Sequence, residues 1–225
     1  MKGETNVVVR ENFEKELTLL QSKLVELVRF SKNALDQSMA AFETHDIELS
    51  LKIMEEDRKA DLLYEEINEY AVMLIAKQQP VAIDLRRIII AIKIATDLER
   101  IADFAVNIAK STIRIGKEEH VKPINTLKKM HEITSTMLQE ALTAYQKDDI
   151  QQAKKVAEMD DQVDSLYGET INDLFQLNNE KSDSLPQITQ FLLICRFLER
   201  SADHITNIVE YIIYLVKGKH YDLNE

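Results

Sequence analysis

The chain has 225 residues, with 28 basic and 39 acidic side chains and a formal net charge of −11. A duplex-binding protein neutralises phosphates with clustered Lys and Arg, so this composition excludes a generic nucleic-acid binder. An acidic chain favours cations or basic protein surfaces as partners. With only 4 Gly and 3 Pro, neither β-sheets nor glycine-rich phosphate loops are expected.

The compartment is indicated by cysteine usage and by the apolar runs. Cys195 is the only cysteine, so no disulfide can form within the chain and nothing points to an oxidising compartment. The N-terminus lacks the apolar segment of a secretory signal. The longest apolar runs, 88–92 and 191–195, are far shorter than the roughly 20 residues that cross a bilayer. We therefore expect a soluble, cytoplasmic protein.

Helical periodicity fills the stretches between the few breaking residues. Apolar side chains recur every three or four positions, which is the period of an α-helix. Pro80, a charged hinge at 116–123 and Pro186 separate the stretches. Asp46 and Asp149 each stand where a helix N-cap is expected. The pattern predicts six long helices, at 7–42, 46–77, 81–115, 124–147, 149–178 and 186–216.

The two halves of the chain are copies of one another. Residues 57–64 resemble 160–167 at a shift of 103, and residues 98–108 resemble 198–208 at a shift of 100. A repeat of about 100 residues with three long helices is too long for a tetratricopeptide or HEAT unit. The fold class predicted is therefore all-α, with six long helices forming two duplicated three-helix bundles in spectrin-like packing.

The predicted bundles divide the chain near its middle. The first is expected at 1–117 and the second at 118–225, related by a pseudo-twofold axis and joined through the hinge.

Pairs of acids four residues apart recur at matching places in both copies. The pairs are Asp57 and Asp61, Glu99 and Asp103, Asp160 and Asp164, and Glu199 and Asp203. Residues one turn apart project from the same helix face, and the apolar positions assign these acids to the outward face. A solvated helix face would explain one such pair. Four pairs at matching positions are different, because like charges one turn apart destabilise a helix and some interaction should offset that cost. All-oxygen clusters suit hard or borderline cations, so the eight acids are candidate metal ligands, with Asn107 or Asn207 as supporting oxygens.

Basic residues stand next to the acids. Arg100 and Arg200 directly follow the Glu of each motif, and we expect each to form a salt bridge to a neighbouring helix rather than to bind an anion. His204 stands beside Asp203, where a packing role is favoured over a ligand role.

Three segments resemble the PhoU family of phosphate-uptake regulators: 79–86 (QPVAIDLR), 97–109 (DLERIADFAVNIA) and 198–208 (LERSADHITNI). Length, duplication and the order of six helices resemble the family as well. The family usually has Ile-Gly before the motif Asp, whereas this chain has Ile101-Ala102 and Ser201-Ala202. Ser201 also places a hydroxyl on the face assigned to the core.

The resemblance implies a function as well as a fold. It implies that the eight acids bind multinuclear iron or zinc clusters, and that the protein is a cytoplasmic homodimer. It further implies a negative regulator of the phosphate response, which couples the ATPase subunit of the high-affinity phosphate ABC transporter to a phosphate-sensing histidine kinase and restrains uptake. Membrane contact would be peripheral, through these partners.

No motif indicates catalysis, because the chain lacks a P-loop and a nucleophile elbow. We expect a regulatory scaffold and not an enzyme. The alternatives are a ferritin-like metal-binding or metal-storage bundle, a plain helical spacer, and an accessory protein of a low-affinity phosphate transporter. The ferritin-like reading is disfavoured because no His has a Glu three residues before it, as those sites require.

Overall fold

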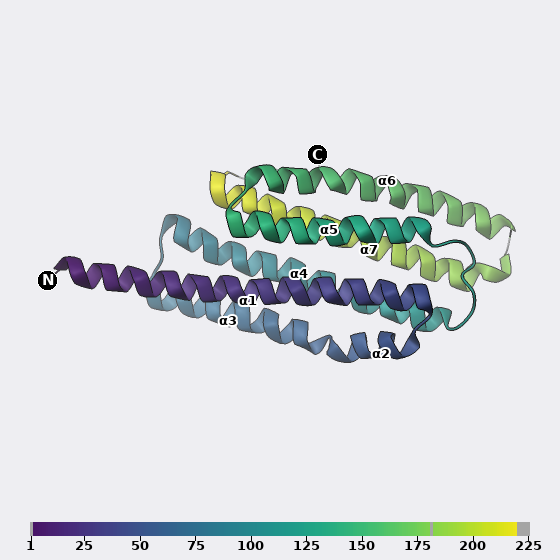
Figure 1. The fold of residues 1–225 in the computed structure, drawn as a ribbon, viewed down its shortest axis with the longest axis horizontal. Coiled ribbons are helices and arrows are strands. Elements are labelled where there is room, and N and C mark those ends of the chain that lie inside the picture. The colour runs from purple at the N-terminus through teal and green to yellow at the C-terminus, as the bar shows by residue number, and fades with distance from the viewer. Residues whose placement is uncertain (1, 181, 220–225) are drawn as a thin grey trace.

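Long helices form almost all of the protein (Figure 1). The computed structural model describes residues 2–180 and 182–219, and the side chains of residues 10–178 and 183–219; no strand occurs in this part. The helices are α1 (Lys2–Thr44), α2 (Ile47–Glu56), α3 (Arg58–Gln78), α4 (Ala82–Ile115), α5 (Asn125–Lys147), α6 (Ile150–Glu180) and α7 (Leu185–Lys217), with a 3-10 turn, η1 (Ser182–Ser184), before α7. The predicted all-α class is confirmed, although one expected helix is divided.

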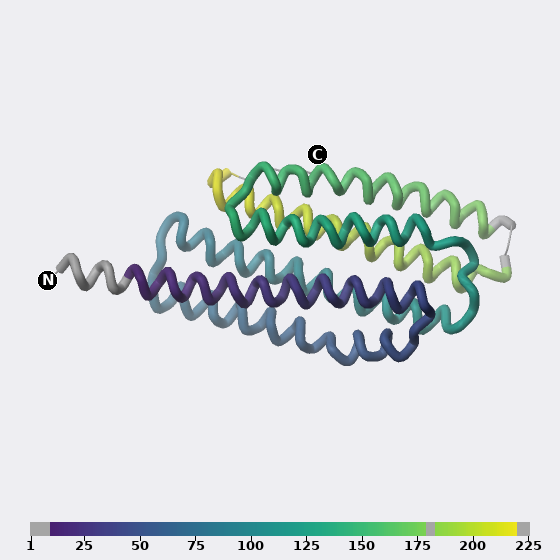
Figure 2. Tube along the Cα trace, in the orientation of Figure 1, coloured from purple at the N-terminus to yellow at the C-terminus, as the bar shows by residue number. Residues whose placement is uncertain are grey.

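The helices form two bundles that lie side by side. The first contains α1 to α4 and the second contains α5 to α7, while α4 packs against α7 and α1 against α5 across the boundary. The connections gather at the two ends of the long axis, and the one between α4 and α5 lies at the end away from the N-terminus (Figure 2). The last six residues of the expected second bundle, 220–225, lie outside the described residues.

Both predicted N-caps are present. The Asp46 carboxylate accepts a hydrogen bond from the backbone N–H of Leu49 at 2.9 Å. The Asp149 carboxylate accepts from the backbone N–H groups of Gln151 and Gln152 at 2.9 and 3.1 Å. Each cap satisfies donors that the first helical turn leaves free. These short side chains therefore mark the turns that no glycine or proline marks.

The expected single helix at 46–77 is broken at Asp57 into α2 and α3. Asp57 keeps helical torsions (φ −50, ψ −43), but its carbonyl accepts from Ala60 N–H at 2.8 Å. This bond spans three residues where an α-helix spans four, so the axis tightens and bends locally. The prediction of one continuous helix was wrong here because no Gly or Pro signals the bend.

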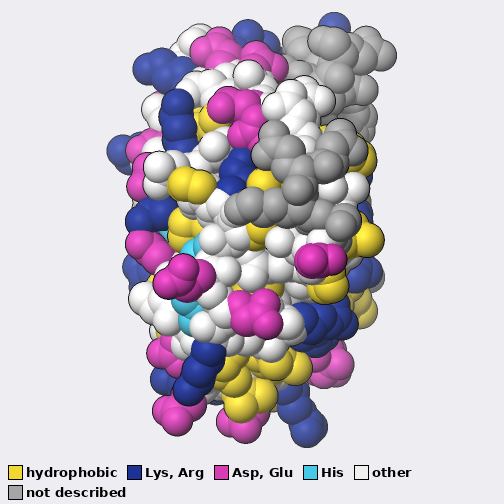
Figure 3. Space-filling view, turned by 90° about the vertical axis from the view of Figure 1, so that its right-hand side faces the viewer, with side chains coloured by type: hydrophobic (Ala, Val, Ile, Leu, Met, Phe, Trp, Pro, Cys, Tyr) yellow, Lys and Arg dark blue, Asp and Glu magenta, His cyan; other side chains and the backbone are white. Residues whose placement is uncertain are grey.

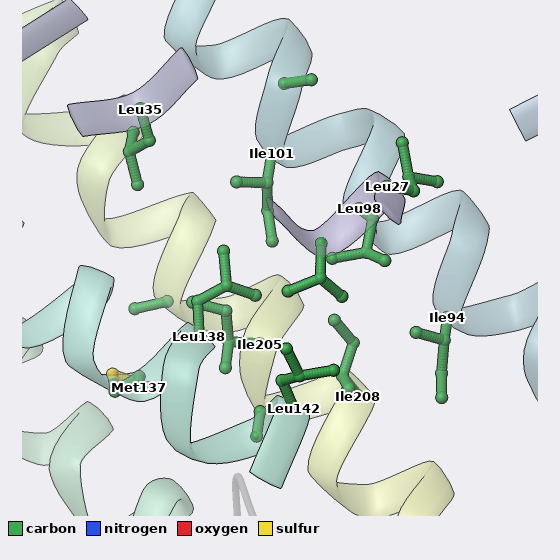
Figure 4. Packing of buried hydrophobic residues seen from close by; sticks show 14 of the residues in the cluster. Leu27, Leu35, Ile94, Leu98, Ile101, Met137, Leu138, Leu142, Ile205 and Ile208 are labelled. Atoms are coloured by element: carbon green, nitrogen blue, oxygen red, sulfur yellow. The ribbon is translucent and has the colours of Figure 1, made fainter. Parts of the chain in front are cut away.

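One hydrophobic core runs through both bundles. The residues predicted to face inward on the third and sixth helices are all at most 3% exposed: Ile94, Leu98, Ile101, Ala105, Ile108, Ile194, Leu198, Ile205 and Ile208. Figure 4 shows Leu98 and Ile101 of α4 beside Ile205 and Ile208 of α7. Ser201 lies on the same face, and its hydroxyl donates a hydrogen bond to the Phe197 carbonyl at 2.7 Å. The buried hydroxyl therefore has a hydrogen-bond partner within its own helix.

A polar pair breaks the symmetry between α4 and α7. His204 Nδ1 lies 2.6 Å from Asp97 Oδ1, and the Asp97 side chain is only 8% exposed. A shift of 100 residues converts this pair into Phe104 and Phe197, whose rings stack with centroids 6.0 Å apart. The same contact between the bundles is therefore polar on one side of the pseudo-twofold axis and aromatic on the other.

We expect Asp97→Ala to lower the free energy of unfolding by about 1 to 3 kcal/mol, because it leaves His204 without its partner in a largely buried site. The double variant Asp97→Phe/His204→Phe places the residues of the symmetric contact here and should recover most of the loss. Urea unfolding followed by circular dichroism measures both. If the double variant loses as much free energy of unfolding as its two single variants lose together, the two contacts are not interchangeable and the expectation is wrong.

A second polar contact joins α1 to α5. Asp36 Oδ1 lies 2.9 Å from His131 Nε2 and accepts from Ser135 Oγ at 2.8 Å. Its other oxygen accepts from Lys32 at 2.7 Å. Burial alone would raise the pKa of Asp36, but the bonds from His131, Lys32 and Ser135 outweigh it and lower the pKa from 3.8 to about 2. The carboxylate is thus stabilised in its ionised form between the two bundles.

A folded pKa below the ordinary value adds stability above pH 4, and this contribution is lost as the pH falls from about 4 to about 2. Allowing for the partial exposure of Asp36, we expect Asp36→Asn to remove about 1 kcal/mol at pH 7 and nearly nothing at pH 2. Urea unfolding at both pH values tests this, with the exposed Glu65→Gln as control. An equal loss at both pH values would contradict it.

Candidate metal centres

The first acidic cluster lies where α2, α3 and α4 meet. Asp57 stands at the bend and Asp61 in the first turn of α3, while Glu99 and Asp103 lie one turn apart on α4. Burial, followed by the charges of Asp103 and Asp61, raises the pKa of Asp57. Burial and the charge of Asp103, with smaller effects of Asp61 and Asp57, raise the pKa of Glu99 against the opposing charge of Arg100. The four predicted ligands of this half therefore lie within Coulombic reach of each other.

This first cluster carries its own cation. Arg100 Nη1 lies 3.1 Å from Asp103 Oδ2, and Arg100 Nε lies 3.6 Å from Glu99 Oε2. The prediction of salt bridges to a neighbouring helix was wrong, because the helical spacing already places acids of the same helix within reach of Arg100. Arg200 instead lies over the ring of Phe104 on α4, 5.1 Å from its centroid, a cation–π contact.

The second cluster is more deeply buried than predicted. Asp160 on α6 was expected on the outward face but is only 7% exposed. Thr206 of α7 donates to Asp160 Oδ2 at 3.1 Å, and this bond offsets part of the cost of burying the carboxylate. Burial, followed by the charges of Asp164 and Asp203, raises the pKa of Asp160 to about 6 against the effect of Thr206.

Glu199 completes the buried part of the second cluster. Its side chain is 12% exposed, and Oε1 accepts from Arg196 at 2.6 Å. Burial and the charge of Asp203 raise the pKa of Glu199 to about 7, with further contributions from Asp164 and Asp160 and an opposing one from Arg196. All four predicted ligands of this half therefore influence one another, as in the first half.

Two carboxylate oxygens of the second cluster are buried without a hydrogen-bond partner: Asp160 Oδ1 and Glu199 Oε2. A buried acceptor without a partner costs about 1 to 3 kcal/mol, and more when it is charged. Oxygen donors of this kind bind hard or borderline cations. The residues of the second half therefore fit a metal ion, whereas in the first half the guanidinium of Arg100 already lies against Glu99 and Asp103.

The clusters are not ready-made metal cages. Among the described residues, no three His, Cys, Asp or Glu side chains stand close enough together to hold one ion. The eight predicted ligands thus form two groups linked by Coulombic interaction, and their role as ligands stays a prediction.

Neighbouring polar residues also have defined partners. Asn207 Nδ2 lies 3.4 Å from Asp97 Oδ1, and His204 also contacts Asp97 and not the cluster. Thr206 is the one contributor that sequence reasoning missed. A threonine three residues after Asp203 is an ordinary helix residue, and only the packing of α6 on α7 shows that it reaches Asp160.

Two duplicated three-helix bundles with an acidic cluster in each define the class of this protein. The PhoU domain model matches residues 24–112 and 127–212, one match in each half. The chain is 37% identical over 219 residues to the phosphate-specific transport system accessory protein PhoU homolog of Clostridium acetobutylicum, covering 97% of this chain and 100% of that protein. It is 28% identical to the accessory protein PhoU of Escherichia coli, covering 96% of this chain and 90% of that protein.

Solved structures agree with these relatives. The phosphate transport system regulatory protein PhoU of Streptococcus pneumoniae superimposes with a TM-score of 0.88 at 28% identity, covering 93% of this chain and 99% of that one. PhoU of Pseudomonas aeruginosa superimposes with a TM-score of 0.89 at 30% identity, covering 92% and 100%. The chain belongs to the PhoU family.

None of the helices in the described residues is long and apolar enough to span a bilayer.

The raised pKa of Glu199 makes stability depend on pH. A folded pKa above the ordinary value stabilises the folded protein at low pH, and this contribution is lost as the pH rises through about 7. In chelator, we expect the wild type to lose free energy of unfolding between about pH 5 and pH 7.5, and Glu199→Gln to reduce that loss by on the order of 1 to 3 kcal/mol. Urea unfolding at the two pH values measures it.

Glu169→Gln on the exposed side of α6 serves as the control and should behave like the wild type. A Glu199→Gln profile that follows the wild type would show that this carboxylate ionises in the folded protein as easily as in the unfolded chain.

Proposed function

We propose that this chain is a negative regulator of the phosphate response, which couples a high-affinity phosphate ABC transporter to a sensor histidine kinase and restrains phosphate uptake. An accessory or regulatory role in phosphate transport follows from family membership. The observation that carries the proposal is the match to PhoU proteins of the phosphate-specific transport system over 97% of the chain. The coupling and its direction are the parts that experiment must test.

The protein would act as a scaffold without catalysis of its own. Its helices present long, rigid faces, which suit simultaneous contact with the transporter's ATPase subunit and with the kinase. Contact with the regulator would bias the kinase towards its phosphatase or inactive state. We place this activity in the cytoplasm, with the protein acting as a homodimer and reaching the membrane only through its partners.

Metal binding is a separate part of the proposal. Asp160, Asp164, Glu199 and Asp203 would hold iron or zinc in the second half, and the two buried oxygens without partners support this assignment. When bound, the ion supplies positive charge that compensates the clustered carboxylates. Thr206 holds Asp160 by one oxygen and leaves the other free to bind.

The first half would bind an ion less readily. Asp57, Asp61, Glu99 and Asp103 offer the same donors, but a cation there would have to displace the contacts of Arg100 with Asp103 and Glu99. Measuring the metal content of Asp160→Asn/Glu199→Gln and of Asp57→Asn/Glu99→Gln would separate the two halves.

Deletion of the gene should raise expression of phosphate-starvation genes several-fold in cells grown in high phosphate, because the kinase is released from restraint. The wild-type gene should restore repression, and a reporter for a transporter gene measures both. Unchanged expression after deletion would contradict a negative regulator.

Complementation with Asp160→Asn/Glu199→Gln tests whether the second cluster is needed, with Glu65→Gln as the matched surface control. Pull-down of the transporter ATPase and of the kinase with the same variants distinguishes loss of partner contact from loss of signalling.

A further inference from the structure

A shallow groove runs between α1 and α3 on the first bundle. It consists of two hollows of about 270 Å³ and 370 Å³, and Glu66 lines both. α1 and α3 lie side by side along this stretch (Figure 1). Leu62 and Met73 are 46% and 41% exposed, although both are large and apolar. The floor is formed by Phe30, Leu62, Leu63, Tyr70 and Met73.

The duplication shows that the fold does not require this apolar floor. At the shift of 103 residues, many buried positions stay apolar in both copies, as with Leu35 and Leu138 or Ile53 and Val156, although Ile67 corresponds to Thr170. Three of the five floor positions instead become polar in the second copy, where they are again at least partly exposed, while Phe30 and Leu63 correspond to Ile133 and Leu166. The counterparts of Leu62, Tyr70 and Met73 are Ser165, Asp173 and Gln176. Because both copies build the same bundle, the exposed apolar side chains of Leu62 and Met73 serve something other than folding, whereas Phe30, Leu63 and Tyr70 also pack against the core.

The rims of the groove carry negative charge that the described part of the chain does not neutralise. Glu26 on α1 and Glu69 on α3 form no ion pair with any described residue, while Lys59, which also lines the groove, pairs with Glu56 at 3.1 Å. Lys23 and Glu66 do pair with each other at 2.8 Å, and this bridge separates the two hollows. An occupant with basic side chains beside an apolar stripe would therefore match both the floor and the rims.

The size of the groove fits one helix. It extends along α3 from Lys59 to Met73, which at 1.5 Å per residue corresponds to about 21 Å, or a helix of about 14 residues. A helix with apolar residues at i, i+3, i+4 and i+7 would lie in such a groove with its charged flanks on the rims. A second copy of this chain is a poorer occupant of this groove than a basic helix, because a chain with a net charge of −11 is less attracted to the free carboxylates of Glu26 and Glu69.

We propose that the α1–α3 groove is a docking site for a basic amphipathic helix of a partner protein. This proposal does not depend on a role in phosphate uptake. Neither the floor nor the rims of the groove include the acidic clusters or their neighbours on α4 and α7. The second bundle carries Ser165, Asp173 and Gln176 at three of these positions, so the two halves of the molecule differ in what they bind.

The probe is a fluorescein-labelled peptide of about 18 Leu and Lys residues, arranged so that one helical face is apolar. A scrambled peptide of the same composition has the same charge but no apolar face. The test variant, Leu62→Ser/Tyr70→Asp/Met73→Gln, carries the residues that the second bundle already uses at these positions. The control variant, Val72→Ser/Phe175→Ser, removes two side chains that are each 61% exposed outside the groove.

Fluorescence anisotropy should show that the wild type and the control variant bind the amphipathic peptide about 10-fold more tightly than the test variant does. The added acid at position 70 attracts the peptide, so charge alone predicts the opposite order. The wild type and the test variant should both bind the scrambled peptide weakly, and the added acid should make the test variant bind it no less tightly than the wild type does. The single variant Met73→Gln should lower affinity in the same direction if the triple variant does not fold.

Three results would overturn the proposal. The first is equal affinity of the wild type and the folded test variant for the amphipathic peptide. The second is equal affinity of the wild type for the amphipathic and scrambled peptides. The third is sedimentation showing that the wild type self-associates while the test variant stays monomeric, which would assign the groove to a second copy of the chain.

Discussion

The packing of α4 against α7 is the contact on which the rest of the structure depends. Each is the last helix of its bundle, and each carries one acidic pair on the side away from the apolar residues that meet in the middle. A change in the register of this contact would displace both acidic pairs at once. The Asp97–His204 pair supplies one fixed point for the register, because a buried polar group must lie opposite its partner. The stacked Phe104 and Phe197 rings supply the other point, through shape.

The two acidic clusters have the same residue types at the same spacings, yet their electrostatic surroundings differ. In the first half Arg100 lies against Glu99 and Asp103. In the second half the equivalent arginine lies over Phe104, and Arg196 reaches only one oxygen of Glu199. The neutralising charge is thus placed differently around two similar sets of carboxylates. The difference arises because Arg100 contacts acids of its own helix, whereas Arg200 lies over a ring of the neighbouring helix.

Sequence periodicity predicted the helices because burial of one face requires it, and Ile94, Leu98 and Ile101 are buried as that reasoning demands. The caps at Asp46 and Asp149 were predictable because their chemistry is local. The bend at Asp57 was not, since no Gly or Pro marks the place where the backbone forms the shorter bond from Ala60 to Asp57. The burial of Asp160 was equally hidden. A helical wheel places it beside the apolar stripe but cannot show that α7 covers it and that Thr206 donates to it.

The mixed contact between α4 and α7 also restricts how copies of the protein can pair with one another. If the first halves of two chains exchanged partners and packed together, Asp97 of each would face Phe104 of the other, a carboxylate buried against a phenyl ring. Pairing two second halves would set Phe197 against His204. Only a first half with a second half satisfies both contacts, so the interface itself disfavours assemblies that pair two first halves or two second halves. Divergence after duplication has thereby made each bundle pack better against the other than against a copy of itself.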